Sequence, residues 1–430
     1  MNTIVDSYHV TDAFTIVHPI TLTHGKGAVV WDNTGKSYID FIGGIGVLNF
    51  GHAHDKIVGA ICEQAKKLTH YAYNAVWHKP YQDYLPRLCQ AIPIKDELVG
   101  MLTNSGAESC ENALKIARQA TGKAGVIAFD GGFHGRTLAT VNLNGKVTPY
   151  KSALGLLSAG VYHLPYPSLD THISCQTAID ALNRLLSVET DVVNIGAIIL
   201  EPVQGEAGFL ALNGEFAKYL RAFCDKHGII LIFDEIQSGF GRTGVPFAFE
   251  RLGVEPDLLP LAKSMAGGMP LGAVIGRTSI MNGLVKGSLG GTYSGNPVAC
   301  AAANAVLDIM ADDTTWQAAK RYEEILLKTI TAWQSDNISS WLAGITGTGS
   351  MRGIILQHPT HGTHPQVMAH VLTKARNQGL LLMPSGKYRH IIRLLPPINI
   401  DETVLIQGLD ILKTVLASLP DNPNELPAYT

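Results

Sequence analysis

One lysine stands in a setting that suits covalent chemistry. Lys263 follows the apolar run at residues 258–262 (LLPLA) and precedes the small residues Ala266, Gly267 and Gly268. Small residues let a flat ring come close to the backbone. A lysine in apolar surroundings loses its proton more readily, and the free amine can bond to a carbonyl carbon. A solvated surface lysine is the ordinary alternative, so Lys263 alone does not decide the chemistry.

A carboxylate closes another apolar run, upstream of this lysine. Asp234 follows residues 229–233 (IILIF), which predict a buried strand. In open α/β sheets, ligands bind at the carboxyl ends of the strands. An acid there can hold the proton on the ring nitrogen of a cofactor that acts as an electron sink. A helix cap is the ordinary alternative for Asp234.

A third segment predicts an anion site. Residues 103–109 (TNSGAES) run into a helix whose apolar face includes Ala113 and Ile116. Gly106 and Ala107 would present their backbone N–H groups at the start of this helix, which suits a phosphate group. An ordinary capped helix explains the same pattern when the segment is taken by itself.

The elements that position these residues follow from the pattern of apolar residues. Buried strands are predicted at residues 125–129, 195–201 and 229–234, and helices at residues 56–68 and 107–120. Apolar runs separated by amphipathic helices indicate an α/β fold with a mainly parallel sheet covered on both faces. Strands at residues 28–32 and 37–41 flank a turn, and a final helix is expected at residues 402–419, before Pro420.

The length of 430 residues and the hydrophobic content of 46% suit a large core in two domains. We expect residues 56–305 to form a large domain that binds the cofactor. Residues 306–430 would form a smaller α+β domain, and residues 1–55 would join it.

Charge and composition exclude several classes of protein. The formal net charge of −3 does not indicate the basic surface that binds nucleic acid or an anionic membrane. No apolar run reaches the roughly 20 residues that span a bilayer, and the first ten residues do not resemble a signal peptide. Six scattered cysteines indicate no disulfide framework, so we expect a cytoplasmic protein. The loop at residues 357–365 holds three histidines, but we expect no metal site.

Taken together, these segments resemble class III (ω-amino acid) aminotransferases over nearly the whole chain. The matching segments are residues 43–49 (GGIGVLN), 105–108 (SGAE), 131–137 (GGFHGRT), 201–206 (EPVQGE), 234–239 (DEIQSG), 263–264 (KS) and 291–297 (GTYSGNP). The set is highly specific, whereas any one segment would not be. The resemblance implies fold type I of the transferases that depend on pyridoxal 5′-phosphate (PLP).

The resemblance also assigns residues to the cofactor ring. Lys263 would hold PLP covalently and would move a proton as general base and acid. Asp234 would pair with the pyridine nitrogen, and Gln237 would lie near the phenolic oxygen. Phe133 and Ile236 would cover the two faces of the ring. The family often has tyrosine where Phe133 stands, which puts a polar substrate contact in doubt but not the stacking.

Three further residues are assigned to the cofactor phosphate. Gly106 and Ala107 would bind it through the helix start. Thr292 would reach the phosphate of the neighbouring subunit. This implies a homodimer with shared active sites, or a tetramer built from such dimers.

Within the family, the likeness is greatest to 4-aminobutyrate aminotransferases. Arg136 matches the arginine that binds the distal carboxylate of the substrate. Glu206 matches the glutamate that pairs with a second arginine, which matches Arg393. Ile45 suits a substrate with bare methylenes. We therefore predict transfer of the amino group of 4-aminobutyrate to 2-oxoglutarate, giving succinate semialdehyde and glutamate.

Two alternatives stay open at this point. One is a PLP transaminase for another ω-amine (5-aminovalerate, a diamine or β-alanine), or one that uses pyruvate as the acceptor. The other is a binding protein without catalysis on the same fold, which the retention of Lys263, Asp234 and Arg136 argues against.

Overall fold

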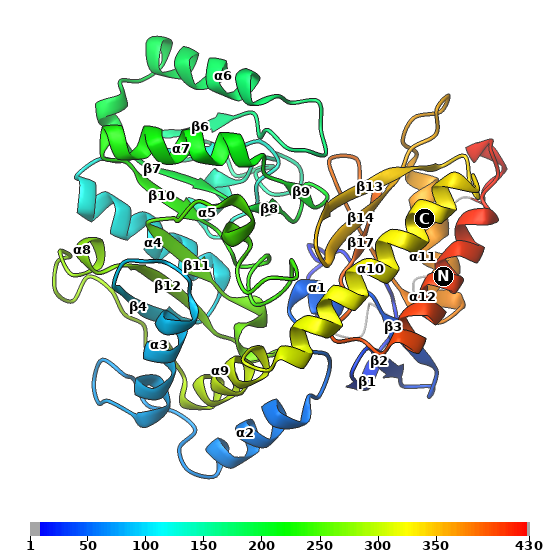
Figure 1. The fold of residues 1–430 in the computed structure, drawn as a ribbon, viewed down its shortest axis with the longest axis horizontal. Coiled ribbons are helices and arrows are strands. Elements are labelled where there is room, and N and C mark those ends of the chain that lie inside the picture. Colours follow the sequence, from blue (N-terminus) through cyan, green and yellow to red (C-terminus); the bar gives the residue numbers. More distant parts are fainter. Residues whose placement is uncertain (1–8, 428–430) are drawn as a thin grey trace.

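A seven-stranded sheet forms the centre of the larger part of the molecule (Figure 1). The computed structural model describes residues 9–427. The strand order is β4 (Leu98–Thr103), β12 (Gly272–Arg277), β11 (Leu258–Leu261), β10 (Ile230–Phe233), β7 (Ile195–Leu200), β5 (Gly125–Phe129) and β6 (Val161–Leu164). Within this sheet, β12 alone runs antiparallel to its neighbours. The predicted mainly parallel sheet is therefore confirmed.

Both faces of this sheet are buried, which explains the continuous apolar runs in its strands. Along β7, Ala197 and Ile199 belong to the core cluster on the α4 face, whereas Ile198 and Leu200 belong to the larger cluster on the opposite face. The helices that cover the sheet include α4 (Gly106–Thr121) on one face, and α6 (Cys175–Val188) and α7 (Gly214–His227) on the other.

A second core lies in the smaller part of the molecule, on the right in Figure 1. Its sheet has the order β13 (Leu342–Thr348), β14 (Met351–Leu356), β17 (Ile391–Leu394) and β16 (Met383–Ser385), with α11 (Pro365–Asn377) and α12 (Glu402–Ala417) in the same core. The N-terminal strands β1 (Leu22–Lys26), β2 (Val29–Asp32) and β3 (Ser37–Asp40) form a further sheet with β15 (Leu380–Leu381). On this basis we propose the division expected above for the described residues, with residues 9–55 joined to residues 306–427; the ends of the expected ranges, 1–8 and 428–430, lie outside the described residues.

The remaining elements connect these sheets. They are α1 (Gly43–Gly46), α2 (Asp55–Ala65), α3 (Lys79–Ala91), α5 (Leu138–Leu143), α8 (Thr278–Met281), α9 (Pro297–Met310), α10 (Asp313–Ser335), β8 (Val203–Gln204) and β9 (Leu210–Ala211). Between residues 9 and 427, no helix is long and apolar enough to cross a membrane.

The ends of the elements depart slightly from the predictions, for local reasons. The helix predicted at residues 56–68 ends at Ala65, because Lys67 bonds back to the carbonyl of Gln64 in a tight turn. The final helix ends at Ala417 rather than at residue 419. The Ser418 hydroxyl donates to the Val415 carbonyl there, a side-chain bond that competes with the helix.

Candidate active site

Two predicted cofactor residues, Asp234 and Lys263, lie at the carboxyl edge of the large sheet together with Glu201. Asp234 directly follows β10, Glu201 directly follows β7, and Lys263 comes two residues after β11 ends. These three strands are neighbours in the sheet and run parallel. Their carboxyl ends therefore meet, and residues far apart in the sequence are brought to one place.

The Lys263 side chain is largely enclosed, and its backbone is strained. Its φ of 49° is a left-handed conformation that residues other than glycine rarely adopt. Such conformations concentrate at functional sites. Burial lowers the pKa of the Lys263 amine, although the nearby carboxylates of Asp234, Glu201 and Glu206 act against this. The amine therefore becomes neutral, and nucleophilic, at a lower pH than that of a free lysine.

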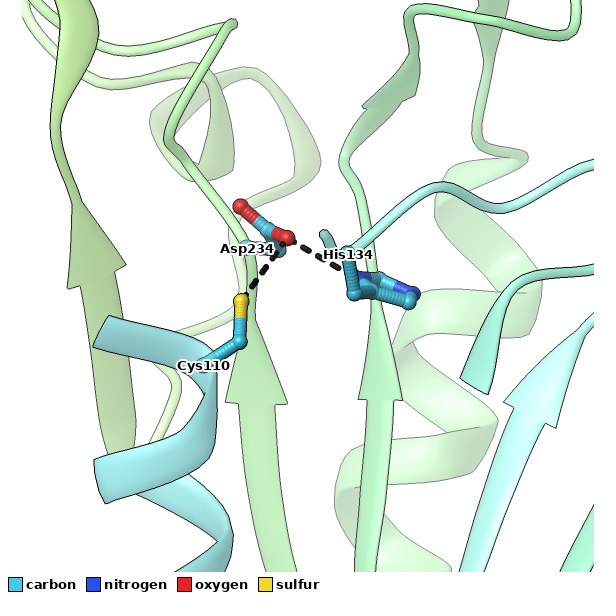
Figure 2. Close-up of side chains that lie close together, drawn as sticks. All are labelled: Cys110, His134 and Asp234. Atoms are coloured by element: carbon cyan, nitrogen blue, oxygen red, sulfur yellow. Dashed lines mark hydrogen bonds and ion pairs between the residues drawn. The ribbon is translucent and has the colours of Figure 1, made fainter. Parts of the chain in front are cut away.

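Two buried side chains anchor Asp234 (Figure 2). His134 Nδ1 lies 2.7 Å from Asp234 Oδ2, and the Cys110 thiol donates to the same oxygen at 3.3 Å. The other oxygen, Oδ1, accepts the N–H of Ile236 at 3.0 Å. Burial acts against a charged His134, but its hydrogen bond to Asp234 and the charge of that carboxylate outweigh burial and raise the pKa of His134. The Asp234 carboxylate thus favours the protonated form of His134 at the end of β10.

The same three side chains are the only group of three or more potential metal ligands between residues 9 and 427. Their hydrogen bonds to one another account for their closeness. The three histidines of residues 357–365 are not gathered into such a group in the described chain. That the site uses no metal stays a prediction.

The start of α4 lies against the residues that follow Asp234. A Cβ placed on Gly106 would lie 2.9 Å from the side chain of Ile236, so only glycine permits this approach. Ser105 caps the helix by accepting the N–H of Glu108. Because the first N–H groups of a helix have no acceptor within it, those of Gly106 and Ala107 are available to an anion.

Gln237, three residues after Asp234, lies close to two glycines. A Cβ on Gly205 would lie 2.0 Å from Gln237 Oε1, and one on Gly46 would lie 3.4 Å from the Gln237 side chain. Two glycines therefore make room for this amide. Gln237 is buried, and its Oε1 has no hydrogen-bond partner among the described residues. A buried polar atom without a partner is uncommon and suits a site that awaits a ligand.

Glu201 orders the backbone around the site. Its two carboxylate oxygens accept the N–H of Phe133 and the N–H of Gly205, each at 2.9 Å. Burial raises the pKa of Glu201, and the charge of Asp234 adds to this, while His134 opposes it. Glu201 therefore fixes Phe133, which was predicted to cover one face of a cofactor ring.

Glu206 and Arg393, which were predicted to pair, are in contact. Arg393 Nη1 lies 2.7 Å from Glu206 Oε1, and Arg393 is only 2% exposed. Glu206 Oε2 accepts a hydrogen bond of 3.1 Å from the Tyr150 hydroxyl. Burial opposes a charged Glu206, but Arg393 and Tyr150 outweigh it and hold the pKa of this carboxyl below its usual value.

Arg136 has no counter-ion among the described residues. Its guanidinium lies over two aromatic rings, 4.9 Å from the centroid of Tyr150 and 5.9 Å from that of Phe133. It is exposed and forms no ion pair within residues 9–427. An unpaired guanidinium held by aromatic rings is well suited to bind a carboxylate as a bidentate fork.

Ile45 and Thr292, the two remaining predicted residues, are both exposed. Ile45 belongs to a run of left-handed residues, Gly43–Gly46, and it is 39% exposed. The Ser264 hydroxyl donates to the Gly46 carbonyl at 3.1 Å, which ties this run to the residue after Lys263. Thr292 is exposed, and no contact within the described chain brings it to the other predicted residues.

Four residues of the site were missed by sequence reasoning. His134 and Glu201 stand within two of the segments quoted above, at residues 131–137 and 201–206. Because Glu201 directly follows β7, a search for polar residues at strand ends would have found it. Nothing in the sequence near Cys110 or Tyr150 signals a role.

Comparisons with known proteins agree with this geometry. Residues 12–416 match the aminotransferase class-III family. The chain is 58% identical over 410 residues to the 2-aminoadipate transaminase of Pseudomonas putida, covering 95% of this chain and 99% of that one. It is 41% identical to the 5-aminovalerate aminotransferase DavT of the same species (94% and 95% covered) and 41% identical to the 4-aminobutyrate aminotransferase GabT of Escherichia coli (92% and 93% covered).

Solved structures give the same result. A PLP-bound amine transaminase from an uncultivated Pseudomonas species superposes with a TM-score of 0.86 at 27% identity, covering 95% of this chain and 98% of that one. The ornithine aminotransferase of Toxoplasma gondii gives a TM-score of 0.83, also at 27% identity, with 96% and 93% covered. The fold is therefore that of the type I PLP-dependent transferases.

The residues present fit this cofactor. An enclosed lysine with a lowered pKa, an anchored aspartate, a helix start with available N–H groups and the unpartnered Oε1 of Gln237 all lie around the carboxyl edge of one sheet. The chain belongs to the class III aminotransferases, and its cofactor is pyridoxal 5′-phosphate.

Proposed function

We propose that this enzyme transfers the amino group of 2-aminoadipate to 2-oxoglutarate, giving 2-oxoadipate and glutamate. The observation that carries the proposal is the presence of two arginines in the site: Arg136, which has no counter-ion among the described residues, and the buried Arg393. A donor with two carboxylates engages both arginines as anchors, as 2-oxoglutarate does. The relative at 58% identity, a 2-aminoadipate transaminase, supports the same donor.

The two anchors bind the substrate by charge. Arg136 takes the distal carboxylate, and the carboxylate beside the reacting carbon replaces Glu206 on Arg393. In the second half-reaction 2-oxoglutarate engages both anchors in the same way. The enzyme therefore handles donor and acceptor with one pocket, in a ping-pong sequence.

The remaining residues carry out or support the proton transfer. When bound, PLP supplies the electron sink that makes the substrate carbon acidic. The Lys263 amine takes the proton from that carbon as general base, which its lowered pKa favours. Asp234, held by His134, keeps a negative charge at the pyridine nitrogen. Gly106 and Ala107 bind the phosphate, Gln237 meets the phenolic oxygen, and Phe133 and Ile236 enclose the ring.

A second candidate donor is 4-aminobutyrate or 5-aminovalerate, and the ion pair between Glu206 and Arg393 favours it. An ω-amino acid has no carboxylate at its reacting carbon, so Arg393 needs another anion, and Glu206 supplies one at 2.7 Å. Ile45 would then border the bare methylenes. The relatives at 41% identity act on these two donors.

We also propose a homodimer in which Thr292 of each subunit reaches the phosphate of the other. Thr292 and its neighbour Tyr293 are exposed in the single chain, Tyr293 by 64%, and so are Tyr71 and Trp77. An exposed aromatic surface of this kind suits an interface with a second copy.

A panel of amino donors with purified enzyme tests the substrate proposal. We expect kcat/KM with 2-oxoglutarate to be highest for 2-aminoadipate, lower for 5-aminovalerate and 4-aminobutyrate, and lowest for diamines and β-alanine. Pyruvate should be a poorer acceptor, because it has no distal carboxylate for Arg136. Preference for 4-aminobutyrate over 2-aminoadipate would favour the second candidate, and preference for a diamine would exclude both.

The Arg136→Ala variant should bind distal carboxylates poorly. A hydrogen bond to a charged group contributes about 1.5–3 kcal/mol, so KM for 2-aminoadipate should rise on the order of 10- to 100-fold. Affinity for PLP should not change. A simple alkylamine serves as the control, because it has no carboxylate to lose. If the variant still prefers 2-aminoadipate over the alkylamine as strongly as the wild type does, Arg136 is not the anchor.

A further inference from the structure

Tyr150 lies between the two carboxylate anchors and contacts a component of each. Its ring carries the Arg136 guanidinium on its face at 4.9 Å and lies 5.0 Å from the ring of Phe133. Its hydroxyl donates to Glu206 at 3.1 Å. Between residues 9 and 427, no other side chain both stacks on Arg136 and bonds to Glu206.

The two oxygens of Glu206 have different partners. Oε1 faces Arg393 at 2.7 Å, and Oε2 accepts the Tyr150 hydroxyl. The bond to Tyr150 therefore does not depend on the ion pair with Arg393. When a substrate carboxylate takes Arg393, Glu206 can keep Tyr150 as its donor.

We propose that Tyr150 is a positioning residue that stabilises Glu206 after it has released Arg393, and that it thereby favours substrates with two carboxylates. This inference rests on the proposed exchange of Glu206 for a substrate carboxylate on Arg393. The ring of Tyr150 has a second role: it holds the Arg136 guanidinium in position to bind the distal carboxylate. The Tyr150 side chain thus positions Arg136 through its ring and Glu206, the partner of Arg393, through its hydroxyl.

The reason is the different cost of losing one donor in the two states. With an ω-amino acid bound, Glu206 has Arg393 and Tyr150, so loss of the hydroxyl leaves a charged partner in place. With a dicarboxylate bound, Arg393 has turned to the substrate, and Tyr150 is the hydrogen-bond donor left to Glu206. A buried acceptor that loses its last donor is destabilised far more than one that loses one of two.

The protonation state of Tyr150 suits this role. Burial and the neighbouring charge of Glu206 raise its pKa to about 12. The hydroxyl therefore stays protonated, and remains a donor, throughout the pH range in which the enzyme works. Lys146 is the rival donor. The charge of Glu206 raises the pKa of Lys146, but burial and the charges of Arg389 and Arg393 outweigh it and lower this pKa.

The test is the binding of two acids that have no amine and so do not react. Glutarate carries two carboxylates and valerate carries one, and calorimetric titration of the PLP-loaded enzyme measures both. In Tyr150→Phe, which keeps the ring, we expect the Kd of glutarate to rise about five- to tenfold. The Kd of valerate should stay within about twofold. In Tyr150→Leu, which also removes the ring beneath Arg136, the binding of both glutarate and valerate should weaken.

Other results would overturn the inference. If Tyr150→Phe weakens glutarate and valerate equally, the hydroxyl does not act through the released state of Glu206. If it changes neither, Lys146 or water replaces Tyr150 as the donor. The inference is separable from the donor proposal. Should wild-type enzyme reject 2-aminoadipate while the contrast between glutarate and valerate holds, the choice of donor fails and the role of Tyr150 stands.

Discussion

The Lys263→Ala variant is expected to lose nearly all transaminase activity while remaining folded. The wild-type amine holds the cofactor and moves a proton at the substrate carbon, and general acid–base catalysis alone contributes about 10²- to 10⁴-fold. Loss of the covalent attachment adds to this. We therefore expect kcat to fall by at least about 10³-fold, a larger effect than for either arginine anchor.

Two measurements check this expectation. Borohydride reduction of the wild-type enzyme followed by peptide mass analysis should find the pyridoxyl group on Lys263, and the variant should carry no label. Lys218→Ala is a suitable control, because Lys218 lies on the exposed face of α7 and pairs with Glu215. A pyridoxyl label on any other lysine of the wild type would contradict the assignment.

The local parts of this site could be predicted because each is encoded by a contiguous segment. An apolar run predicts a buried strand, and the polar residue that follows it lies at the edge of the sheet. The positions of Asp234 and Lys263 could be predicted in this way. Ser105, Gly106 and Glu108 encode a capped helix start by their order alone. The expected fold class and cofactor followed from these segments and from the resemblance they carry.

The contacts between segments could not be predicted from the same patterns. His134 meets Asp234 across 100 residues of sequence, and Cys110 meets it across 124. Cys110 does not differ in polarity from an ordinary core residue, and the segment around His134 does not indicate which residue it contacts. Tyr150 and Glu206 are 56 residues apart, and Tyr150 lies in an irregular segment after α5, where no periodicity indicates which way a side chain points.

The position of β12 is another feature that the sequence did not indicate. Its apolar run at Gly272–Arg277 has the pattern of any buried strand, yet it runs antiparallel between β4 and β11. Periodicity reports burial on both faces but not strand direction. The direction follows from the connection, since Lys263–Ala266 and a short turn return the chain at once rather than through a crossover helix. That short return places Lys263 at the sheet edge with a left-handed backbone.

The anchoring of Asp234 gives the second large effect. In Asp234→Asn the side chain keeps its shape but loses its charge, so the pyridine nitrogen has no anion to hold its proton. His134 also loses the carboxylate that raises its pKa, and it should become neutral. Removal of one preorganised electrostatic partner of a reacting group typically lowers kcat about 10²- to 10³-fold, and we expect a loss of this size. Steady-state kinetics and the absorbance spectrum of the bound cofactor measure these changes.

Cys110→Ala separates the charge of Asp234 from its surroundings. The variant removes only a weak thiol donor at 3.3 Å and leaves His134 at 2.7 Å, so we expect less than about a tenfold loss in kcat, since an ordinary hydrogen bond contributes about 0.5–1.5 kcal/mol. The loss in kcat for His134→Ala should lie between those for Cys110→Ala and Asp234→Asn, because Asp234 keeps its carboxylate but loses the imidazole beside it. If Asp234→Asn retained kcat to within tenfold, the carboxylate would not be the partner of the ring nitrogen. The buried group of Cys110, His134 and Asp234 would then need another explanation, and metal binding would be the first to test.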